Sequence, residues 1–487
     1  MENNNNGKLL QYFGLTTGII LIVSSIIGTG VYKKVAPMSL NLQSPELVLL
    51  AWGLAGLVTL LGVLTVAEIA MLIPKSGGPF AYLREMYGEK TAYFYGWASF
   101  ATIQSASTAS ISYVFAQSLN SIVTLPRLSE DWEAMNLFGI FYPFANIGVK
   151  LMAVLLIAVL TAVNYRGVKQ GGRVSNVITV IVLASLALII VLGLTVGGGS
   201  MANITQPAST YPPSAFGESF GFMKLIFLAM LSAFWAYEGW MNVGFVGDEI
   251  RNPQRNIPRI LIFGILLIIT IYLLVNFTYL YVMPVDEMLH GYVQTDAAGN
   301  FLTNQDGTFK LNDNFIAAVE VIRKFFGNGG AFFISLLIVV TTMGCTNATI
   351  LTAARIYYAM AEKGLFFKRA AFVHPKFRTP SNALVMFAVW SSVLVFSGTF
   401  DQLTDMMVFS QFIFYGLVVA GIFILRKKMK DAPRSYRTLG YPVVPLLFVL
   451  FCAVFILNTL IEKPREAGMG LALIVLGTPF YFLFKKR

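Results

Sequence analysis

The sequence has few charged residues and few of the side chains that enzymes use for chemistry. Only 12% of its 487 residues are charged, whereas soluble domains contain about a quarter, and it has two histidines and two cysteines. Both cysteines lie in apolar runs, which excludes a disulfide scaffold and provides no metal-ligand spacing. Because the histidines and carboxylates are scattered as well, we expect no enzyme activity, no cofactor and no metal site.

The sequence also lacks a long polar stretch that could form a soluble domain, since 56% of the residues are apolar. The formal net charge of +11 would suit nucleic-acid binding if the basic residues clustered with aromatic ones on a polar face. They lie instead in short segments between apolar runs. We therefore expect no nucleic-acid partner and a chain that is buried mainly in membrane lipid.

Apolar runs of membrane-spanning length recur along the whole sequence. A spanning helix needs about 20 predominantly apolar residues, and we find twelve such runs. They lie at 12–37, 46–74, 91–124, 145–165, 174–196, 219–248, 259–284, 329–360, 382–399, 404–425, 442–461 and 468–484. The runs are too long for barrel strands and do not alternate, so they predict an all-α integral membrane protein with twelve transmembrane helices.

The basic residues predict the orientation of the chain. If the N-terminus is cytoplasmic, the loops and tails on that side contain 24 lysines and arginines, and the opposite side contains 10. An excess of this kind marks the cytoplasmic side. We expect a multi-pass protein of the plasma or bacterial inner membrane, with residues 1–11 as a cytoplasmic tail and both termini in the cytoplasm.

Two of the apolar runs contain residues that disfavour a continuous membrane helix. The first run contains Gly28, Thr29 and Gly30, and glycine costs about 1 kcal/mol relative to alanine inside a helix. The sixth run contains Glu238 followed by Gly239, and an acid at the bilayer centre costs roughly 2.5–3.5 kcal/mol. Both runs are therefore predicted to unwind near the midplane, where free backbone groups are tolerated only if they line a cavity or bind something.

Breaks in runs one and six predict two repeats of five helices, at 12–200 and 201–426, with the last two helices and a short tail at 427–487. Repeats of this kind are typical of secondary transporters, which hold their substrate where the repeats meet. Freed N–H groups at a helix start suit an anion, and freed carbonyls suit a cation, so the breaks suit an α-amino acid. Small residues also mark close helix packing, and a glycine pair alone would be a weak signal.

Several motifs together resemble the amino acid–polyamine–organocation superfamily, and within it the L-type amino-acid transporters. They are IIGTG at 26–30, KSGGPFAY at 75–82 with YG at 87–88, WAYEGW at 235–240 with DEIRNP at 248–253, the segment 354–364 with HP at 374–375, and YP at 441–442. The resemblance implies a LeuT-type fold with a 5+5 inverted repeat, discontinuous helices one and six, and two C-terminal helices. It implies amino-acid transport by alternating access, usually as sodium-independent exchange. The alternatives are a proton- or sodium-coupled symporter for amino acids or polyamines and, more distantly, a membrane enzyme or a channel.

The resemblance also implies a substrate site. The N–H groups of Thr29 and Gly30, after Gly28, would hold the substrate carboxylate. The carbonyls of Ile26, Trp235 and Glu238, beside Gly239, would hold its amino group, and the Trp235 ring would act as a gate over the substrate. Polar residues of helices three, eight and ten could line the side-chain pocket, although such residues often only join helices together: Gln104, Ser105, Thr108, Asn347, Thr349, Ser410 and Gln411.

The sequence departs from the family pattern at three places. Many relatives carry a lysine in helix five in place of a sodium ion, and this chain has Val182, so coupling to sodium, to protons or to neither stays open. Thr352 could be a cation ligand, but Ala353 and Ala354 beside it have no hydroxyl. Residues 125–144 contain no cysteine, so no disulfide to a heavy-chain partner is expected there. The partners that we expect are neutral amino acids, with cationic ones left open, and membrane lipid.

Two charged residues within membrane helices have more than one interpretation. Glu238 could neutralise a cationic substrate side chain, could bind and release a proton during transport, or could form a hydrogen bond within the bundle. Arg355 could serve an inner gate or could extend from a helix end towards the headgroups. Lys33 and Lys34, which follow the first break, are interpreted as residues of an outer vestibule.

Overall fold

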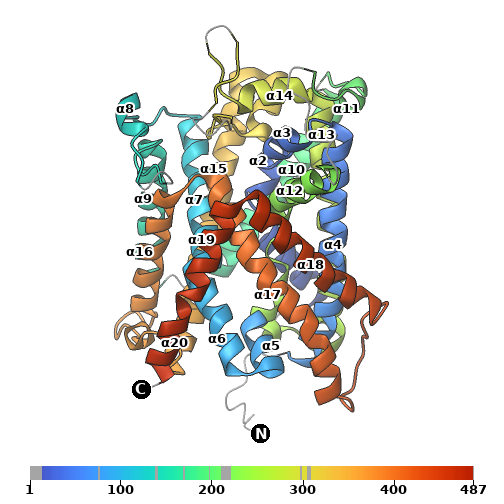
Figure 1. Cartoon of the computed structure of the whole chain (residues 1–487), viewed down its shortest axis with the longest axis vertical. Helices are drawn as coiled ribbons and strands as arrows, with labels where there is room; N and C mark the ends of the chain where they lie inside the picture. The colour runs from blue at the N-terminus through green and yellow to red at the C-terminus, as the bar shows by residue number, and fades with distance from the viewer. Residues whose placement is uncertain are drawn as a thin grey trace.

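The computed structural model describes residues 14–74, 77–137, 141–167, 171–196, 198–209, 221–296, 299–303 and 309–485. These residues form a bundle of helices that run mostly along one axis (Figure 1). The β-pairing found among them consists of isolated bridges, such as that between Val293 and Leu311. The all-α prediction is confirmed. The expected tail at 1–11 and the first two residues of the motif at 75–82 lie outside the described residues.

The first five membrane segments contain both long and interrupted helices. Their helices are α1 Leu15–Ile26, α2 Gly30–Lys33, α3 Val35–Leu42, α4 Pro45–Leu72, α5 Gly78–Tyr87, α6 Glu89–Ala98, η1 Ser99–Ile103, α7 Gln104–Asn120, α8 Glu130–Glu133, α9 Ile147–Tyr165, α10 Gly171–Thr195 and α11 Ala202–Thr205. The third segment is formed by α6, a short π-helix and α7 in succession. Short helices such as α8 lie in the connections.

The remaining seven segments also contain both long and interrupted helices. Their helices are α12 Gly221–Ala236, η3 Trp240–Glu249, α13 Pro253–Val282, α14 Val285–Tyr292, α15 Ala317–Glu362, η4 Lys368–Ala371, α16 Ser381–Ser397, α17 Phe400–Lys428, α18 Val443–Glu462, α19 Pro464–Val475 and α20 Gly477–Lys485. Gly327 has non-helical torsions within α15, so the predicted run at 329–360 begins just after a kink. All twelve predicted runs therefore contain helix.

Local sequence sets the ends of several helices. Ser44 precedes α4, and its hydroxyl accepts a hydrogen bond from the Leu47 N–H, while Pro45 occupies the first helical position. Thr399 and Gln402 form a reciprocal capping box at the start of α17. The cap fixes where α17 begins, and so it fixes the depth of the polar residues in its first turns.

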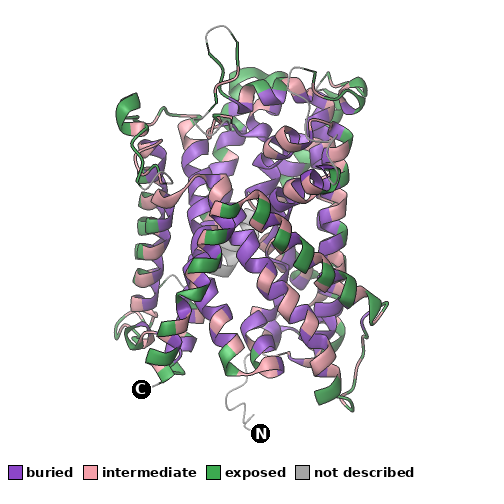
Figure 2. Ribbon diagram, in the orientation of Figure 1, coloured by how far each residue is buried: buried purple, intermediate pink, exposed green. Residues whose placement is uncertain are grey.

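The outer faces of the bundle are apolar, and part of its interior is polar. Leu450, Leu457 and Ile461 on α18 are 61%, 60% and 74% exposed, which suits contact with lipid. Figure 2 shows the exposed residues along the outward sides of the peripheral helices. By contrast, α7 is almost wholly buried and contains many small hydroxyl residues, which allow neighbouring helices to approach closely. The chain is a multi-pass membrane protein.

Both predicted breaks are present. After α1 ends at Ile26, Ile27 has extended torsions, and helical structure resumes at Gly30. After α12 ends at Ala236, Gly239 adopts φ 110°, and the chain continues as a 3-10 helix. Each broken segment packs against the other, with α1 against η3 and α2 against α12. The fold is of the LeuT type, and the repeat limits at 200 and 426 stay a prediction.

Candidate functional site

The two breaks lie in direct backbone contact. A Cβ atom added to Gly239 would lie 2.2 Å from the Ser25 carbonyl oxygen. A Cβ atom added to Gly30 would lie 2.7 Å from the Ala236 Cα atom. Only glycine permits so close an approach at these two positions, because any side chain would separate the segments. The glycines that predicted unwinding therefore also bring the unwound segments together.

A single hydroxyl group on α13 joins the two breaks. The Tyr272 hydroxyl lies 2.9 Å from the Ala236 carbonyl oxygen and 3.2 Å from the Ile26 carbonyl oxygen, and it can donate to either. Tyr272 is fully buried and packs edge-on against Trp52, with 5.6 Å between the ring centroids. Nearby, the Tyr237 hydroxyl donates to the Trp52 carbonyl oxygen at 3.2 Å. Aromatic side chains thus pack against the two breaks. One of them, Tyr272, supplies a hydrogen-bond donor to a freed carbonyl of each break.

Tyr272→Phe is expected to slow the amino-acid transport that the family resemblance implies by about 10- to 100-fold. The change leaves two buried carbonyls without this donor, and an unsatisfied buried group costs about 1–3 kcal/mol. Tyr279→Phe is the matched control, since Tyr279 lies two turns along the same helix, is also fully buried, and has a hydroxyl without a partner among the described residues. Initial rates of uptake into vesicles would check this. Equal rates for the two variants would contradict the assigned role of Tyr272.

The first break exposes backbone donors at the start of a helix. The N–H groups of Thr29 and Gly30 precede the first complete turn, and no acceptor is found for them within the described part of the chain. The helix continues in right-handed torsions through Lys34 into α3, so its dipole also favours an anion at this end. The Thr29 hydroxyl is buried and has no partner there either. This arrangement suits a carboxylate.

The second break contributes a carboxylate and an aromatic ring. The Tyr415 hydroxyl of α17 donates to Glu238 Oε2 at 2.5 Å, and the Gly239 N–H donates to the same carboxylate. Glu238 is half-buried. Trp235 is 6% exposed, lies near Gly30, and meets the Phe400 ring edge-on at 6.2 Å. The ring thus lies between the first break and the start of α17.

The sequence profile of the amino acid permease family matches residues 13–481 of the chain, which is nearly its whole length. The chain belongs to this family. The serine/threonine exchanger SteT of Bacillus subtilis is 29% identical over 489 residues, which cover 100% of this chain and 99% of the relative. Human b(0,+)-type amino acid transporter 1 is 29% identical, covering 98% of this chain and 88% of the relative. The human large neutral amino acids transporter small subunit 2 is also 29% identical, covering 98% and 80%. All three relatives are named as exchangers or transporters of amino acids.

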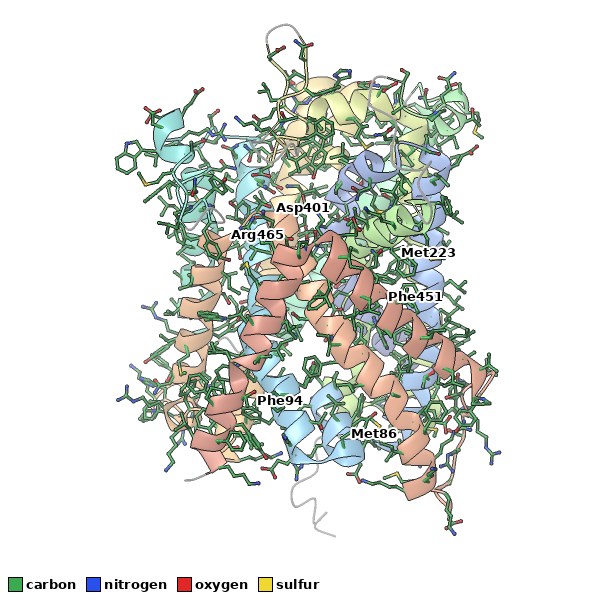
Figure 3. The ribbon with its side chains drawn as sticks, viewed as in Figure 1. Met86, Phe94, Met223, Asp401, Phe451 and Arg465 are labelled. Carbon is green, nitrogen blue, oxygen red and sulfur yellow. The ribbon has the colours of Figure 1, made fainter. Side chains whose placement is uncertain are left out.

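Between the breaks and the end of the permease that carries α14, two lysines are buried instead of lining an open vestibule. Lys34 is 0% exposed, and its Nζ atom lies 2.6 Å from Asp401 Oδ1 and 2.6 Å from the Thr404 hydroxyl. The Tyr292 hydroxyl donates to the other oxygen of Asp401 at 3.0 Å. Figure 3 shows Asp401 towards the end of the bundle that carries α14. These contacts join α2, α14 and α17 into one closed layer.

Lys33 extends the same layer towards α7. Its Nζ atom lies 2.7 Å from Gln117 Oε1 and 2.6 Å from the Asp313 carbonyl oxygen. Gln117 Nε2 also donates to that carbonyl. Burial raises the pKa of the Asp313 carboxyl, and the nearby Lys33 ammonium opposes this rise. The predicted vestibule is therefore a compact network of buried charges and polar groups.

Most of the polar residues predicted to line the pocket have partners within the bundle. Asn347 accepts a hydrogen bond from Asn164 of α9 at 2.8 Å, and the Thr349 hydroxyl donates to a carbonyl one turn back on α15. The hydroxyl of Thr352, the candidate cation ligand, does the same. Ser105 and Ser410 bond in the same local way. Such contacts indicate that these residues join helices together or form hydrogen bonds within one helix.

Three other pocket candidates have a different environment. The Thr108 hydroxyl and Gln411 Oε1 are buried without a partner among the described residues, and Gln104 is half-buried at the start of α7. Unsatisfied buried oxygens are costly unless a ligand or water reaches them. Thr108 and Gln411 are therefore better placed than the rest of the set to contact a substrate.

A small cavity lies beside the first break. Its volume is about 40 Å³, and it is lined by Val23, Ser24, Ile27, Thr179, Val182, Leu183, Gly344, Cys345 and Ala348. Val182 of the fifth segment therefore lines the same cavity as Ser24 and Ile27 of the first break. Thr352 lies one turn beyond Ala348 on α15 and is not among the lining residues. The walls are mostly apolar, which is a poor environment for a bare cation.

The end of the permease opposite the buried lysines contains the paired glycines of the motif at 75–82. Gly77 and Gly78 adopt φ 131° and 51°, and the Cα atom of Gly78 lies close to Gly244 of η3. The turn thus packs against the continuation of the second break. Arg355 on α15 is exposed, so its assignment to an inner gate stays a prediction.

Sequence reasoning missed Tyr272, Tyr415 and Asp401. The two tyrosines lie in apolar runs, where nothing in the sequence distinguishes them from packing residues. Asp401 did carry a signal, because it lies between Thr399 and Gln402 of a capping box, the pattern of a helix start.

Proposed function

We propose that the chain is a secondary-active amino-acid exchanger that binds its substrate where the two breaks meet. The observation that carries the proposal is the contact between the breaks, joined by Tyr272, with free N–H groups at Thr29 and Gly30. The substrate carboxylate would bind these N–H groups. Its ammonium group would bind the carbonyls of Ile26, Trp235 and Glu238. The Trp235 ring would cover it, and Thr108 and Gln411 would contact its side chain.

The relatives and the small cavity support exchange without an ion. SteT is named as a serine/threonine exchanger, and the human relatives are named as amino acid transporters. In this chain the cavity beside the first break has Val182 and other apolar residues in its walls, and two of its lining residues, Ser24 and Thr179, carry a hydroxyl group. Sodium requires several oxygen ligands at once. Movement of one amino acid would therefore be driven by the opposite movement of another.

Alternating access would require the layer of buried charges to open. In this structure Lys33 and Lys34 join α2, which starts at the substrate site, to Gln117, Asp313 and Asp401. Access from that side would follow when α2 separates from α17. We place this side outside the cell, because the lysines and arginines accumulate in the loops at the opposite end. Both termini would then be cytoplasmic, and the two repeats would comprise 12–200 and 201–426.

The proposal also concerns partners. The chain has two cysteines, Cys345 and Cys452, both free and within membrane helices. No cysteine is therefore available at 125–144 for a disulfide to a second chain. We expect the chain to transport amino acids without a covalently linked partner.

Counterflow in liposomes tests the proposed function. Vesicles loaded with one unlabelled amino acid should accumulate labelled amino acid from outside, and empty vesicles should not. Accumulation should be the same with and without sodium or a pH gradient. Uptake into empty vesicles driven by sodium or by protons would show a symporter instead, and no uptake of any of the twenty amino acids would overturn the proposal.

Glu238→Gln is expected to reduce arginine uptake at least tenfold and to leave neutral amino-acid uptake within about twofold. The carboxylate is the charge that the second break would offer to a cationic side chain, and the amide keeps the size but removes the charge. Tyr415→Phe is the control, because it removes the hydrogen bond and keeps the charge. Competition of labelled leucine uptake by arginine would measure both. If arginine uptake is unchanged in Glu238→Gln, Glu238 does not neutralise a cationic substrate. Its role would then be to bind and release a proton or to form a hydrogen bond within the bundle.

A further inference from the structure

A second cavity lies far from the breaks, at the end of the bundle where α17 finishes. It has a volume of about 540 Å³. One wall comes from the end of α4, with Met71 and Leu72, and from Pro74 after it. The opposite wall is the segment 427–433, which leaves α17. The cavity therefore has an apolar side next to a membrane helix and a basic side.

The basic side contains two lysines whose ammonium groups have no partner among the described residues. These are Lys427 and Lys430, which are exposed, and no hydrogen bond or ion pair of either ammonium group is found within the described part of the chain. Lys428 instead donates to the Glu85 carbonyl oxygen at 2.9 Å. With Asp431 at the same rim, the three lysines leave a formal charge of +2. An anion would find free ammonium donors here.

The segment that carries these lysines is fixed in place by other residues. Glu68 of α4 is completely buried and accepts from Arg426 at 2.7 and 3.0 Å and from the Thr438 N–H at 2.7 Å. Arg434 lies 3.3 Å from the same carboxylate and also donates to three carbonyls, among them that of Met429 at 2.6 Å. These contacts hold both ends of the segment and leave Lys427 and Lys430 unused. The cavity is thus preformed, which lowers the cost of binding.

We propose that this cavity binds the phosphate-bearing headgroup of an anionic membrane lipid. The phosphate would lie between Lys427 and Lys430, and the lipid would continue along the apolar wall of Leu72 and Pro74, which are partly exposed. Basic pockets between membrane helices at the level of the headgroups are suited to such lipids. A soluble phosphate could use the lysines but not the apolar wall. The lipid would contact α4 and α17 together, and both helices also contact the broken segments.

Native mass spectrometry of the purified full chain, titrated with phosphatidylglycerol or phosphatidylcholine, tests the proposal. We expect preferential binding of phosphatidylglycerol, and a dissociation constant about tenfold larger for the double variant K427Q/K430Q. K368Q/K376Q is the matched control, because it removes the same charge from exposed lysines in the connection between α15 and α16, at the same end of the bundle. Asp431→Asn should tighten binding, a result that a misfolded variant could not produce.

Three results would overturn the proposal. Equal loss of phosphatidylglycerol in the two double variants would show general attraction to a basic surface. Unchanged binding in K427Q/K430Q would place the lipid elsewhere. Competition by inorganic phosphate at a similar concentration would show that the site recognises soluble phosphate and not a lipid. Each of these experiments measures lipid binding. The test therefore stays valid even if the chain does not exchange amino acids.

Discussion

Gly239→Ala is expected to abolish counterflow. The added Cβ atom would lie 2.2 Å from the Ser25 carbonyl oxygen and 2.9 Å from its carbon, both of them backbone atoms that cannot rotate away. The residue also adopts φ 110°, a conformation that residues with a side chain rarely adopt and that costs them about 1–3 kcal/mol. The two breaks would have to move apart, and the substrate groups that they present would lose their relative positions.

Gly53→Ala provides the control for this prediction. Gly53 also lies in a membrane helix, α4, but a Cβ atom there would meet its nearest neighbour, Leu273, at 4.0 Å, an ordinary contact distance. We expect it to transport at close to the normal rate. Counterflow and gel filtration of both variants would separate a loss of transport from a loss of folded protein. Normal counterflow in Gly239→Ala would mean that the breaks do not have to be in contact for transport.

Asp401→Asn is expected to open the layer of buried charges at least tenfold more often. The change leaves the Lys34 ammonium buried without its counter-ion, and breaking a buried pair in this way costs about 3–5 kcal/mol. This cost raises the free energy of the closed arrangement and not that of the open one, because water reaches the Lys34 ammonium once the layer opens. Exchange should slow, because the step that closes this side becomes unfavourable.

Modification of an introduced cysteine measures the opening. In a chain with Cys345 and Cys452 replaced by alanine, Thr108→Cys lies nine residues, or about 13 Å, before Gln117 of the layer on α7. A membrane-impermeant maleimide should label it at least tenfold faster with Asp401→Asn. The charge exchange K34D/D401K should restore slow labelling. Asp405→Asn should change labelling less, because Asp405 lies 3.9 Å from a partly exposed partner, Lys463. Slow labelling in Asp401→Asn would contradict a gating role.

The fold could be predicted from the sequence largely because a membrane imposes simple rules. The lengths of the apolar runs predict the membrane segments. The glycines and one acid in runs one and six predict the two breaks, which the structure confirms. These features are local. A short apolar helix such as Ser381–Ser397 was recognised for the same reason.

The contacts that organise the site could not be predicted, since they join residues far apart in the sequence. Lys34 and Asp401 are separated by 367 residues, and Lys33 and Asp313 by 280. No rule of spacing relates such pairs, and the lysines alone suggested an open vestibule. Tyr272 is one of many aromatic residues in apolar runs, and only its position beside two freed carbonyls distinguishes it. Asn347 has the polarity of a substrate contact but bonds to Asn164.

One helix, α17, meets three separate polar centres along its length. Asp401 lies near its start, Tyr415 at its middle and Arg426 near its end, about 21 Å and about 16 Å apart along the axis. They contact Lys34, Glu238 and Glu68 in turn. A tilt of α17 about its middle would act as a lever, moving its two ends in opposite directions while the pivot stays beside Glu238. A defect at one end should then be relieved by a second substitution at the far end, about 37 Å away, where the two side chains never touch.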